Sequence, residues 1–508
     1  MLLYDGEAQI VHPTRTMTIV YPYSFANRAR HIVAIITTSM SLIATTVAAE
    51  LPSTVIAALK AASIPARNVS VAVLDVDSGR PLIRHNAQQA MNPASTMKLI
   101  TTYAALEMLG PAHTWKTDAL ADAAPVDGTL NGNLYLRGSG DPRLALEQFW
   151  LLLRHLRLRG IGRIQGDLVL DRSAFSLPPH DPAQFDNEPL RPYNAGADAL
   201  LINLKSLSLT LQPAQETVTI LAETPGVAPY LNNRLKLSNE SCGDWREKIN
   251  VELSGETITL HGNYARSCGA KSLNLSPWSA DLQIERLFRA LWRELGGSLE
   301  GQVRAGTVPP GALLLTQHES PALGEIVREI NKYSNNVMAR QVFLTLDAAR
   351  PATPAGARQR IQTWLDEKSL AMPELALDNG SGLSREERIS AENLARLLLA
   401  AWQSPVMPEL MASLPVAGID GTLKKRLGNQ AATGRAHLKT GYLSNVRALA
   451  GYVLDTSGKR WIVVALINDP NARNGKPAMD LLLQGIAERL YVPDGNNRAG
   501  RESPGHPR

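Results

Sequence analysis

Apolar and polar positions alternate in short runs at both ends of the chain, and these runs predict strands. Near the N-terminal end, β-branched residues dominate 68–74, and 81–85 can return as its paired strand after a Gly-containing turn. Near the C-terminal end, 437–441, 446–454 and 461–467 have the same character. We therefore expect one five-stranded antiparallel sheet that combines both ends of the chain.

Two helices are predicted beside these strands. One begins near Pro93 and stops at Gly110, with Ser95 in its first turn and Lys98 one turn further along the same face. The other extends over 476–490, with its apolar residues on one face. Since such helices cover the faces of a sheet, the expected fold class is α/β.

The middle of the chain, from about 115 to 310, differs in character. Short alternating runs separated by Gly, Pro and Asn predict mainly β structure, with one helix near 282–295. The predicted strands lie at 132–136, 166–170, 206–211, 217–221 and 251–260. Because this block lies between the two halves of one α/β domain, we interpret it as an insertion.

The N-terminal segment has the features of a cleaved secretory signal. Arg28-Ala29-Arg30-His31 precedes an apolar stretch, Ile32–Ala49, that ends in small residues. A membrane anchor is the alternative, but the stretch contains six Ser and Thr residues and is barely long enough to cross a bilayer. We expect export, with 1–49 as a signal peptide with an extended N-terminus and Met17 as a candidate start.

Composition excludes several functions. A hydrophobic content of 44% and a charged content of 19% are typical of a soluble globular protein. The net charge of +5 is mildly basic, but Lys and Arg form no clustered tracts, so nucleic-acid binding is not expected. No CxxC or HExxH motif occurs and the histidines are scattered, so we expect neither a metal site nor a cofactor.

Cys242 and Cys268 both lie in the middle segment. In an oxidising compartment they can form one disulfide, which would close a loop of about 26 residues and stabilise the fold by about 3 kcal/mol. A disulfide here would agree with export.

Three short motifs, in this order along the chain, predict an acyl-transferase that activates serine with lysine. They are Ser95-Thr96-Met97-Lys98, Ser334-Asn335-Asn336 and Lys439-Thr440-Gly441. Each alone has an ordinary explanation: a capped helix with a surface lysine, a helix cap before a polar turn, or an exposed strand with a turn glycine. Their order and their positions on the predicted elements make the set specific.

The first two motifs have the residues for nucleophilic catalysis. A serine hydroxyl needs a base, and Lys98 can serve Ser95 if burial and the charge of Lys439 lower its pKa. Ser334 can relay a proton to the leaving amine. Asn336 can direct its amide at Lys98 and at the substrate backbone.

The third motif has the residues for substrate binding. Lys439 and Thr440 can bind a carboxylate, and Gly441 would let a substrate backbone approach closely. The backbone N–H groups of Ser95 and Tyr442 would form an oxyanion hole.

On these residues the chain resembles the class C low-molecular-mass penicillin-binding proteins, the D-alanyl-D-alanine carboxypeptidase/endopeptidase family. The likeness extends from about 52 to 490 and includes four further stretches. These are Leu134–Pro142, Gly166–Phe175, Asp378–Arg385 and Gly418–Leu423. The long gap between Ser95 and Ser334 also fits, because this family inserts two extra domains there.

The resemblance implies a serine β-lactamase/DD-peptidase-like domain, with a five-stranded antiparallel sheet flanked by helices, that is interrupted by two mainly β inserted domains. The expected parts are a catalytic domain (50–114 and 311–492), inserted domain II (115–195 and 275–310), inserted domain III (196–274) and a disordered tail (493–508).

The resemblance also implies a periplasmic serine hydrolase of peptidoglycan. Ser95 would attack the peptide bond before a D-alanine, releasing the terminal residue or cutting a cross-link, and β-lactam antibiotics should acylate the same serine. Arg385 is then the expected contact for the carboxylate of a diaminopimelate side chain, and Glu188 for its amine. The balance of carboxypeptidase and endopeptidase activity, a homodimer and loose membrane association are left open.

Two alternatives stay open at this point. A serine β-lactamase or esterase has the same three motifs, but it would have to account for the long insertion. A catalytically inactive cell-wall-binding protein would be expected to lack at least one of Ser95, Lys98, Ser334, Asn336 and Lys439, and all five are present.

Overall fold

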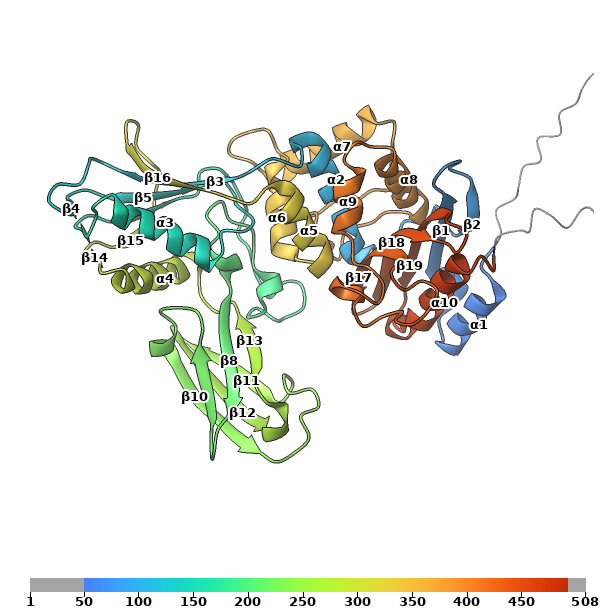
Figure 1. The fold of residues 1–508 in the computed structure, drawn as a ribbon, viewed down its shortest axis with the longest axis horizontal. Coiled ribbons are helices and arrows are strands. Elements are labelled where there is room, and N and C mark those ends of the chain that lie inside the picture. Colours follow the sequence, from blue (N-terminus) through green and yellow to red (C-terminus); the bar gives the residue numbers. More distant parts are fainter. Residues whose placement is uncertain (1–49, 492–508) are drawn as a thin grey trace, which may run out of the picture. The chain divides into compact units, whose positions relative to one another are not determined.

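The computed structural model describes residues 50–491, and it contains the expected five-stranded antiparallel sheet (Figure 1). The strand order is β17-β18-β19-β1-β2, so the N-terminal strands lie beside the C-terminal ones. The strands are β1 (Val69–Asp75), β2 (Pro81–His85), β17 (Ala436–Leu443), β18 (Val446–Leu454) and β19 (Arg460–Asn468). The signal peptide and the tail expected from the sequence lie outside the described residues.

Both faces of this sheet are covered by helices, because its inner strands are apolar on both sides. β1 is buried at every position. Val71 and Val73 belong to one hydrophobic core, and Ala72 and Leu74 belong to another, because successive side chains of a strand point to opposite faces. The first core includes α1 (Ser53–Ala61) and α10 (Lys476–Ala487), and the second includes α2 (Lys98–Leu109) and α8 (Ala391–Trp402).

The helix α2 is buried along most of its length, because other helices surround it. These are α5 (Leu323–Tyr333), α6 (Asn336–Thr345), α7 (Pro354–Glu367) and α9 (Met407–Ser413). The helix begins later than predicted, since Ala94–Met97 form a 3₁₀ turn before it. It stops at Gly110 as predicted, where φ is +81°. None of the helices between residues 50 and 491 has the length and apolar character that a membrane crossing requires.

A first inserted unit is built on a second five-stranded sheet, of order β15-β7-β5-β3-β16. Its elements are β3 (Lys116–Ala121), β4 (Thr129–Leu130), β5 (Leu134–Gly138), α3 (Leu146–Leu158), β6 (Arg163–Ile164), β7 (Leu168–Asp171), α4 (Ala280–Glu294), β14 (Ser298–Leu299), β15 (Val303–Ala305) and β16 (Leu313–Glu319). The two helices and the sheet share one hydrophobic core.

The prediction of a single helix in this region was wrong, because α3 was missed. Its buried face consists of Phe149, Leu152, Leu153 and Leu156. Trp150 is only partly buried against the same core and Leu151 is exposed, so the sequence reads as one continuous apolar run instead of an amphipathic period.

A second inserted unit contains two three-stranded sheets, β13-β8-β9 and β10-β12-β11. Its strands are β8 (Leu207–Pro213), β9 (Val218–Ala222), β10 (Leu231–Ser238), β11 (Ile249–Ser254), β12 (Thr257–Ala265) and β13 (Lys271–Leu275). The stretch 251–260, predicted as one strand, is divided at Gly255, where φ of +57° allows the turn between β11 and β12.

Two of the expected domain boundaries differ from those in the structure, as the pairing of one strand and the packing of two side chains show. The strand at 313–319 pairs with β3, so the sheet of the first inserted unit extends past 311. Leu200 and Ile202 pack into the core of the same unit, so that unit also extends past 195.

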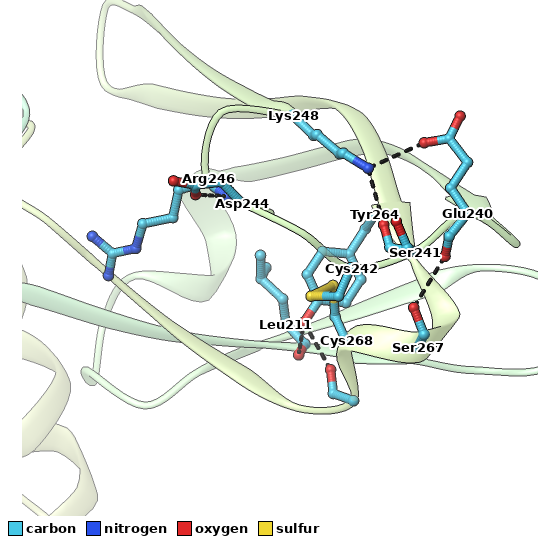
Figure 2. The surroundings of a disulfide bond; sticks show 11 residues. Leu211, Glu240, Ser241, Cys242, Asp244, Arg246, Lys248, Tyr264, Ser267 and Cys268 are labelled. Atoms are coloured by element: carbon cyan, nitrogen blue, oxygen red, sulfur yellow. Dashed lines mark hydrogen bonds and ion pairs between the residues drawn. A yellow bond between two sulfur atoms is a disulfide. The ribbon is translucent and has the colours of Figure 1, made fainter. Parts of the chain in front are cut away.

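A disulfide joins Cys242 to Cys268 in the second inserted unit, a bond that the sequence allowed but left open (Figure 2). It connects the loop between β10 and β11 to the turn after β12. Nζ of Lys248 donates a 3.0 Å hydrogen bond to the carbonyl oxygen of Ser241, and Oγ of Ser267 donates one of 3.0 Å to that of Glu240. The disulfide and these bonds hold the loop against the sheet.

Candidate active site

Ser95 lies on a tight turn in front of α2, and the segments around it fix this turn. Ala94 has a φ of +45°, a left-handed conformation that is uncommon for alanine. The Asn92 side chain accepts a 2.8 Å hydrogen bond from the Ala94 N–H and donates one of 2.9 Å to the carbonyl oxygen of Ser384. Because N–H groups in a first helical turn have no partner within the helix, the N–H of Ser95 can bind an oxyanion.

Two glycines let neighbouring segments approach this turn. A Cβ on Gly441 would lie 2.7 Å from the carbonyl oxygen of Pro93, and a Cβ on Gly382 would lie 2.0 Å from that of Ala94. Gly441 therefore makes room for the serine turn itself, whereas the sequence suggested a substrate backbone at this position.

Lys98 is fully buried at the start of α2 and is bonded to three oxygens. Its Nζ donates a 3.1 Å hydrogen bond to Oγ of Ser95 and one of 2.6 Å to Oδ1 of Asn336. A third bond goes to the carbonyl oxygen of Ser381. The predicted nucleophile, base and amide are thus in direct contact.

The environment of Lys98 favours the neutral amine. Burial holds the pKa of Lys98 well below its usual value, and the positive charges of Lys439 and Arg340 act in the same direction. The carboxyl group of Glu387 opposes them. A lysine whose pKa is lowered in this way can accept a proton from a serine hydroxyl.

Ser334 occupies a strained backbone position between α5 and α6. Its φ of 60° and ψ of 40° are left-handed, which costs a residue other than glycine about 1–3 kcal/mol. The cap of α6 is Asn335, whose side chain accepts a hydrogen bond from the N–H of Met338. Oγ of Ser334 accepts a 2.9 Å hydrogen bond from Nζ of Lys439. The Ser334 side chain therefore bonds to a residue of the third motif and does not cap a helix.

Lys439 is fully buried on β17, the edge strand of the central sheet. Burial lowers the pKa of Lys439 to about 7. Oγ1 of Thr440 lies 2.8 Å from Oγ1 of Thr422. Tyr442 is 68% exposed, and the guanidinium of Arg447 lies 3.5 Å from the centroid of its ring. An edge strand of this kind can pair with an extended peptide.

Hydrogen bonds gather the three motifs into two groups. Ser95, Lys98 and Asn336 form the first group, and Ser334 and Lys439 form the second. The charge of Lys439 acts on Lys98 and so couples the two groups. Residues that lie far apart in the sequence therefore converge at the start of α2.

Arg385 lies in a cavity of about 580 Å³. Its guanidinium is 4.4 Å from the centroid of the Phe185 ring. Phe185, which also lines the cavity, packs against a small apolar cluster that contains Ala94. The cavity therefore adjoins the turn that carries Ser95.

Glu188, the residue expected to bind the amine, does not lie in this cavity. It forms an ion pair of 3.0 Å with Arg191 and lies outside the lining of the cavity. The exposed carboxylate of Asp181 does line the cavity, so it is better placed than Glu188 to meet a ligand there.

Two residues of the site had no predicted role. Thr422 belongs to the stretch 418–423, which supported the resemblance, but its contact with Thr440 follows from the fold. Glu387 is fully buried, whereas its neighbour Glu386 is exposed. In the sequence the two glutamates carry no signal that distinguishes them.

In the part of the chain that the structure describes, no group of three or more His, Cys, Asp or Glu side chains could hold a metal ion.

Comparison with known proteins identifies the family. The D-Ala-D-Ala carboxypeptidase 3 (S13) family matches residues 52–486. The chain belongs to this family. It is a serine-type D-Ala-D-Ala carboxypeptidase and a low-molecular-mass penicillin-binding protein.

Similar proteins match over most of their length. The D-alanyl-D-alanine carboxypeptidase of Actinomadura sp. (strain R39) is 30% identical over 441 residues, which cover 83% of this chain and 80% of the relative. The D-alanyl-D-alanine carboxypeptidase DacB of Haemophilus influenzae is 26% identical over 408 residues, which cover 79% and 85%. The crystal structure of penicillin binding protein 4 from H. influenzae has a TM-score of 0.70 at 24% identity, over 85% of this chain and 99% of that one, and shows the shared fold.

Proposed function

We propose that this carboxypeptidase acts in the periplasm on peptidoglycan stem peptides and cross-links through an acyl-serine intermediate. The observation that carries this proposal is the 3.1 Å contact between Nζ of the buried Lys98 and Oγ of Ser95. A lysine with a strongly lowered pKa is the kind of base that a serine nucleophile needs.

In the proposed acylation step, Lys98 takes the proton of Ser95 while Oγ attacks the carbonyl carbon before the terminal D-alanine. The new C–O bond forms, and the C–N bond of the peptide then breaks. The proton returns to the leaving amine through Ser334. The N–H groups of Ser95 and Tyr442 bind the oxyanion, and one such donor contributes roughly 2.7–4 kcal/mol to the transition state.

In the deacylation step, a water molecule attacks the ester carbonyl carbon. Lys98 takes a proton from this water as its oxygen bonds to the carbon. The ester C–O bond breaks, the peptide leaves with a new carboxylate, and Ser95 regains its proton.

The residues around Ser95 carry charges opposite to those of the proposed substrate. The ammonium group of Lys439 and the hydroxyl group of Thr440 bind the carboxylate of the terminal D-alanine. Arg385 binds the carboxylate of a diaminopimelate side chain in the adjoining cavity, and Asp181 takes the role for its amine that the sequence assigned to Glu188.

β-Lactams resemble the D-Ala-D-Ala end, so we propose that they acylate Ser95. A structure of penicillin binding protein 4 from H. influenzae, which shares this fold, is a complex with a β-lactam. A peptidoglycan endopeptidase from Bdellovibrio bacteriovorus also has the fold, with a TM-score of 0.51. These neighbours support both the proposed inhibition and the proposed cleavage of cross-links.

The test is digestion of two purified diaminopimelate-containing muropeptides, a pentapeptide monomer and a D-Ala-linked dimer. The products of wild type and of Ser95→Ala are measured by mass spectrometry. We expect wild type to release free D-alanine from the first and monomers from the second, and Ser95→Ala to do neither. A folded wild-type protein that releases no D-alanine would refute the proposal.

A further inference from the structure

Glu387 is a buried carboxyl group that the proposed mechanism does not use. Its side chain is fully inaccessible to solvent. Oε1 accepts hydrogen bonds of 3.2 Å and 2.9 Å from the backbone N–H groups of Asn379 and Gly380. Oε2 is also buried and has no hydrogen-bond partner among residues 50–491. A carboxylate oxygen in this position would be desolvated without compensation, which favours a proton on Oε2.

The loop that Glu387 holds contacts the base Lys98 and the helix that carries it. The carbonyl oxygen of Ser381, next to Gly380, accepts a hydrogen bond from Nζ of Lys98. The carbonyl oxygen of Gly380 accepts one of 2.7 Å from Oγ1 of Thr101, which lies on the same helix as Lys98. Glu387 and Lys98 therefore bond to backbone groups of the same short loop.

Charged groups surround both side chains in this enclosed region. Lys439 and Arg340 act on Lys98 and lower its pKa, whereas Glu387 raises it. Burial raises the pKa of Glu387 itself to about 7, and the negative charge of Asp378 acts in the same direction. A buried acid with a raised pKa and a buried base with a lowered pKa are thus within electrostatic reach of each other.

We propose that Glu387 is a positioning residue whose ionisation is coupled to that of Lys98 and thereby sets the charge of the lysine that activates Ser95. The inference rests on the proposed role of Lys98 as the base. When the Glu387 carboxyl is neutral, Lys98 has no negative partner there and stays an uncharged amine. When the carboxyl is ionised, it favours the inactive ammonium form of Lys98.

The substitution Glu387→Gln tests this. Glutamine keeps the size of the side chain and an oxygen for the N–H groups of Asn379 and Gly380, but it cannot ionise. The rate of acylation by benzylpenicillin is measured between pH 5 and pH 9 by intact mass. Because Lys98 loses a negative neighbour, we expect the acid limb of the profile to move to lower pH by about half a unit or more.

The matched control is Glu392→Gln, a nearby glutamate that forms an ion pair with Arg84. It should leave the acid limb in place. If Glu387→Gln lowers the rate equally at every pH, Glu387 only supports the loop and the inference is overturned. If wild type forms no adduct at any pH, the proposed function fails instead.

A second measurement leaves Glu387 intact, in case Glu387→Gln does not fold. Infrared titration of protein labelled with ¹³C-glutamate follows the buried acid in wild type and in Lys98→Met. Because linkage between two sites is reciprocal, loss of the lysine charge should raise the midpoint of this acid. An unchanged midpoint would overturn the inference.

Discussion

Nζ of Lys439 donates a 2.9 Å hydrogen bond to Oγ of Ser334, which lies 105 residues earlier in the chain. The bond joins the edge strand β17 to the left-handed residue at the end of α5. It thus connects the group proposed to bind the substrate carboxylate with the group proposed to relay the proton. A change at either residue should disturb both functions.

The alkaline limb of the pH profile is predicted to follow Lys439. Burial lowers the pKa of Lys439 to about 7 in the free enzyme, so the ammonium that binds the carboxylate is present below this pH and is lost as the pH rises. For release of D-alanine from a D-Ala-D-Ala peptide, kcat/KM should therefore fall above neutral pH, approaching about tenfold per unit. The peptide with an amidated C-terminus, which has no carboxylate to bind, is the control. The same alkaline limb with that peptide would contradict the assignment.

Asn336→Asp is predicted to raise the pKa of Lys98. The new carboxylate would stand where the amide oxygen now lies, 2.6 Å from Nζ of Lys98, and an adjacent negative charge stabilises the ammonium. Acylation by benzylpenicillin at neutral pH should fall at least about tenfold and recover at higher pH. Asn336→Leu, which removes the hydrogen bond without adding charge, should lose activity without that recovery. A profile for Asn336→Asp that is parallel to wild type would show that Lys98 is not the base.

The sequence could predict the central sheet and the convergence of the motifs. The strands at 81–85 and 446–454 match their predicted limits, because each is a continuous β-rich run bounded by turn residues. The third motif lies on β17 of this sheet. The first motif lies at the start of α2, which packs against one face of the sheet. Their order along the chain and their positions on the predicted elements together indicated one site.

Other features of the site depend on contacts made in the folded protein, which no local sequence pattern can predict. The burial of Glu387 follows from the packing of its loop on α2. The contact of Gly441 with Pro93 joins residues from opposite ends of the chain. Glu188 has the charge to bind an amine, but the pairing with Arg191 that holds it outside the cavity is visible only in the fold.

Removal of the disulfide by the double substitution Cys242→Ser and Cys268→Ser is predicted to affect stability and not chemistry. The loop that it closes spans 26 residues, and loss of such a closure lowers the free energy of unfolding by about 3 kcal/mol. The core of the second inserted unit shares no residues with the two cores of the central sheet. Calorimetry should show a lower melting temperature for the unit, while the rate of acylation by benzylpenicillin stays unchanged. Loss of acylation in a folded double variant would contradict this separation.

Arg385→Gln is predicted to change substrate selectivity. Loss of a hydrogen bond to a charged group costs about 1.5–3 kcal/mol, so kcat/KM for a diaminopimelate peptide should fall by roughly 10- to 100-fold. Acylation by benzylpenicillin, which has no such side chain, should stay the same. The matched control is Arg360→Gln, which removes an arginine paired with Glu367 outside the cavity lining. An equal loss on a peptide with lysine in place of diaminopimelate would contradict the role of Arg385.

The most direct test of the account is the intact mass of the purified protein after incubation with benzylpenicillin, beside that of Ser95→Ala. The account predicts a stoichiometric adduct on wild type that is absent from Ser95→Ala, with peptide mapping that places the added mass on Ser95. An unlabelled but folded wild-type protein, or an adduct that persists in Ser95→Ala, would contradict the acyl-serine mechanism.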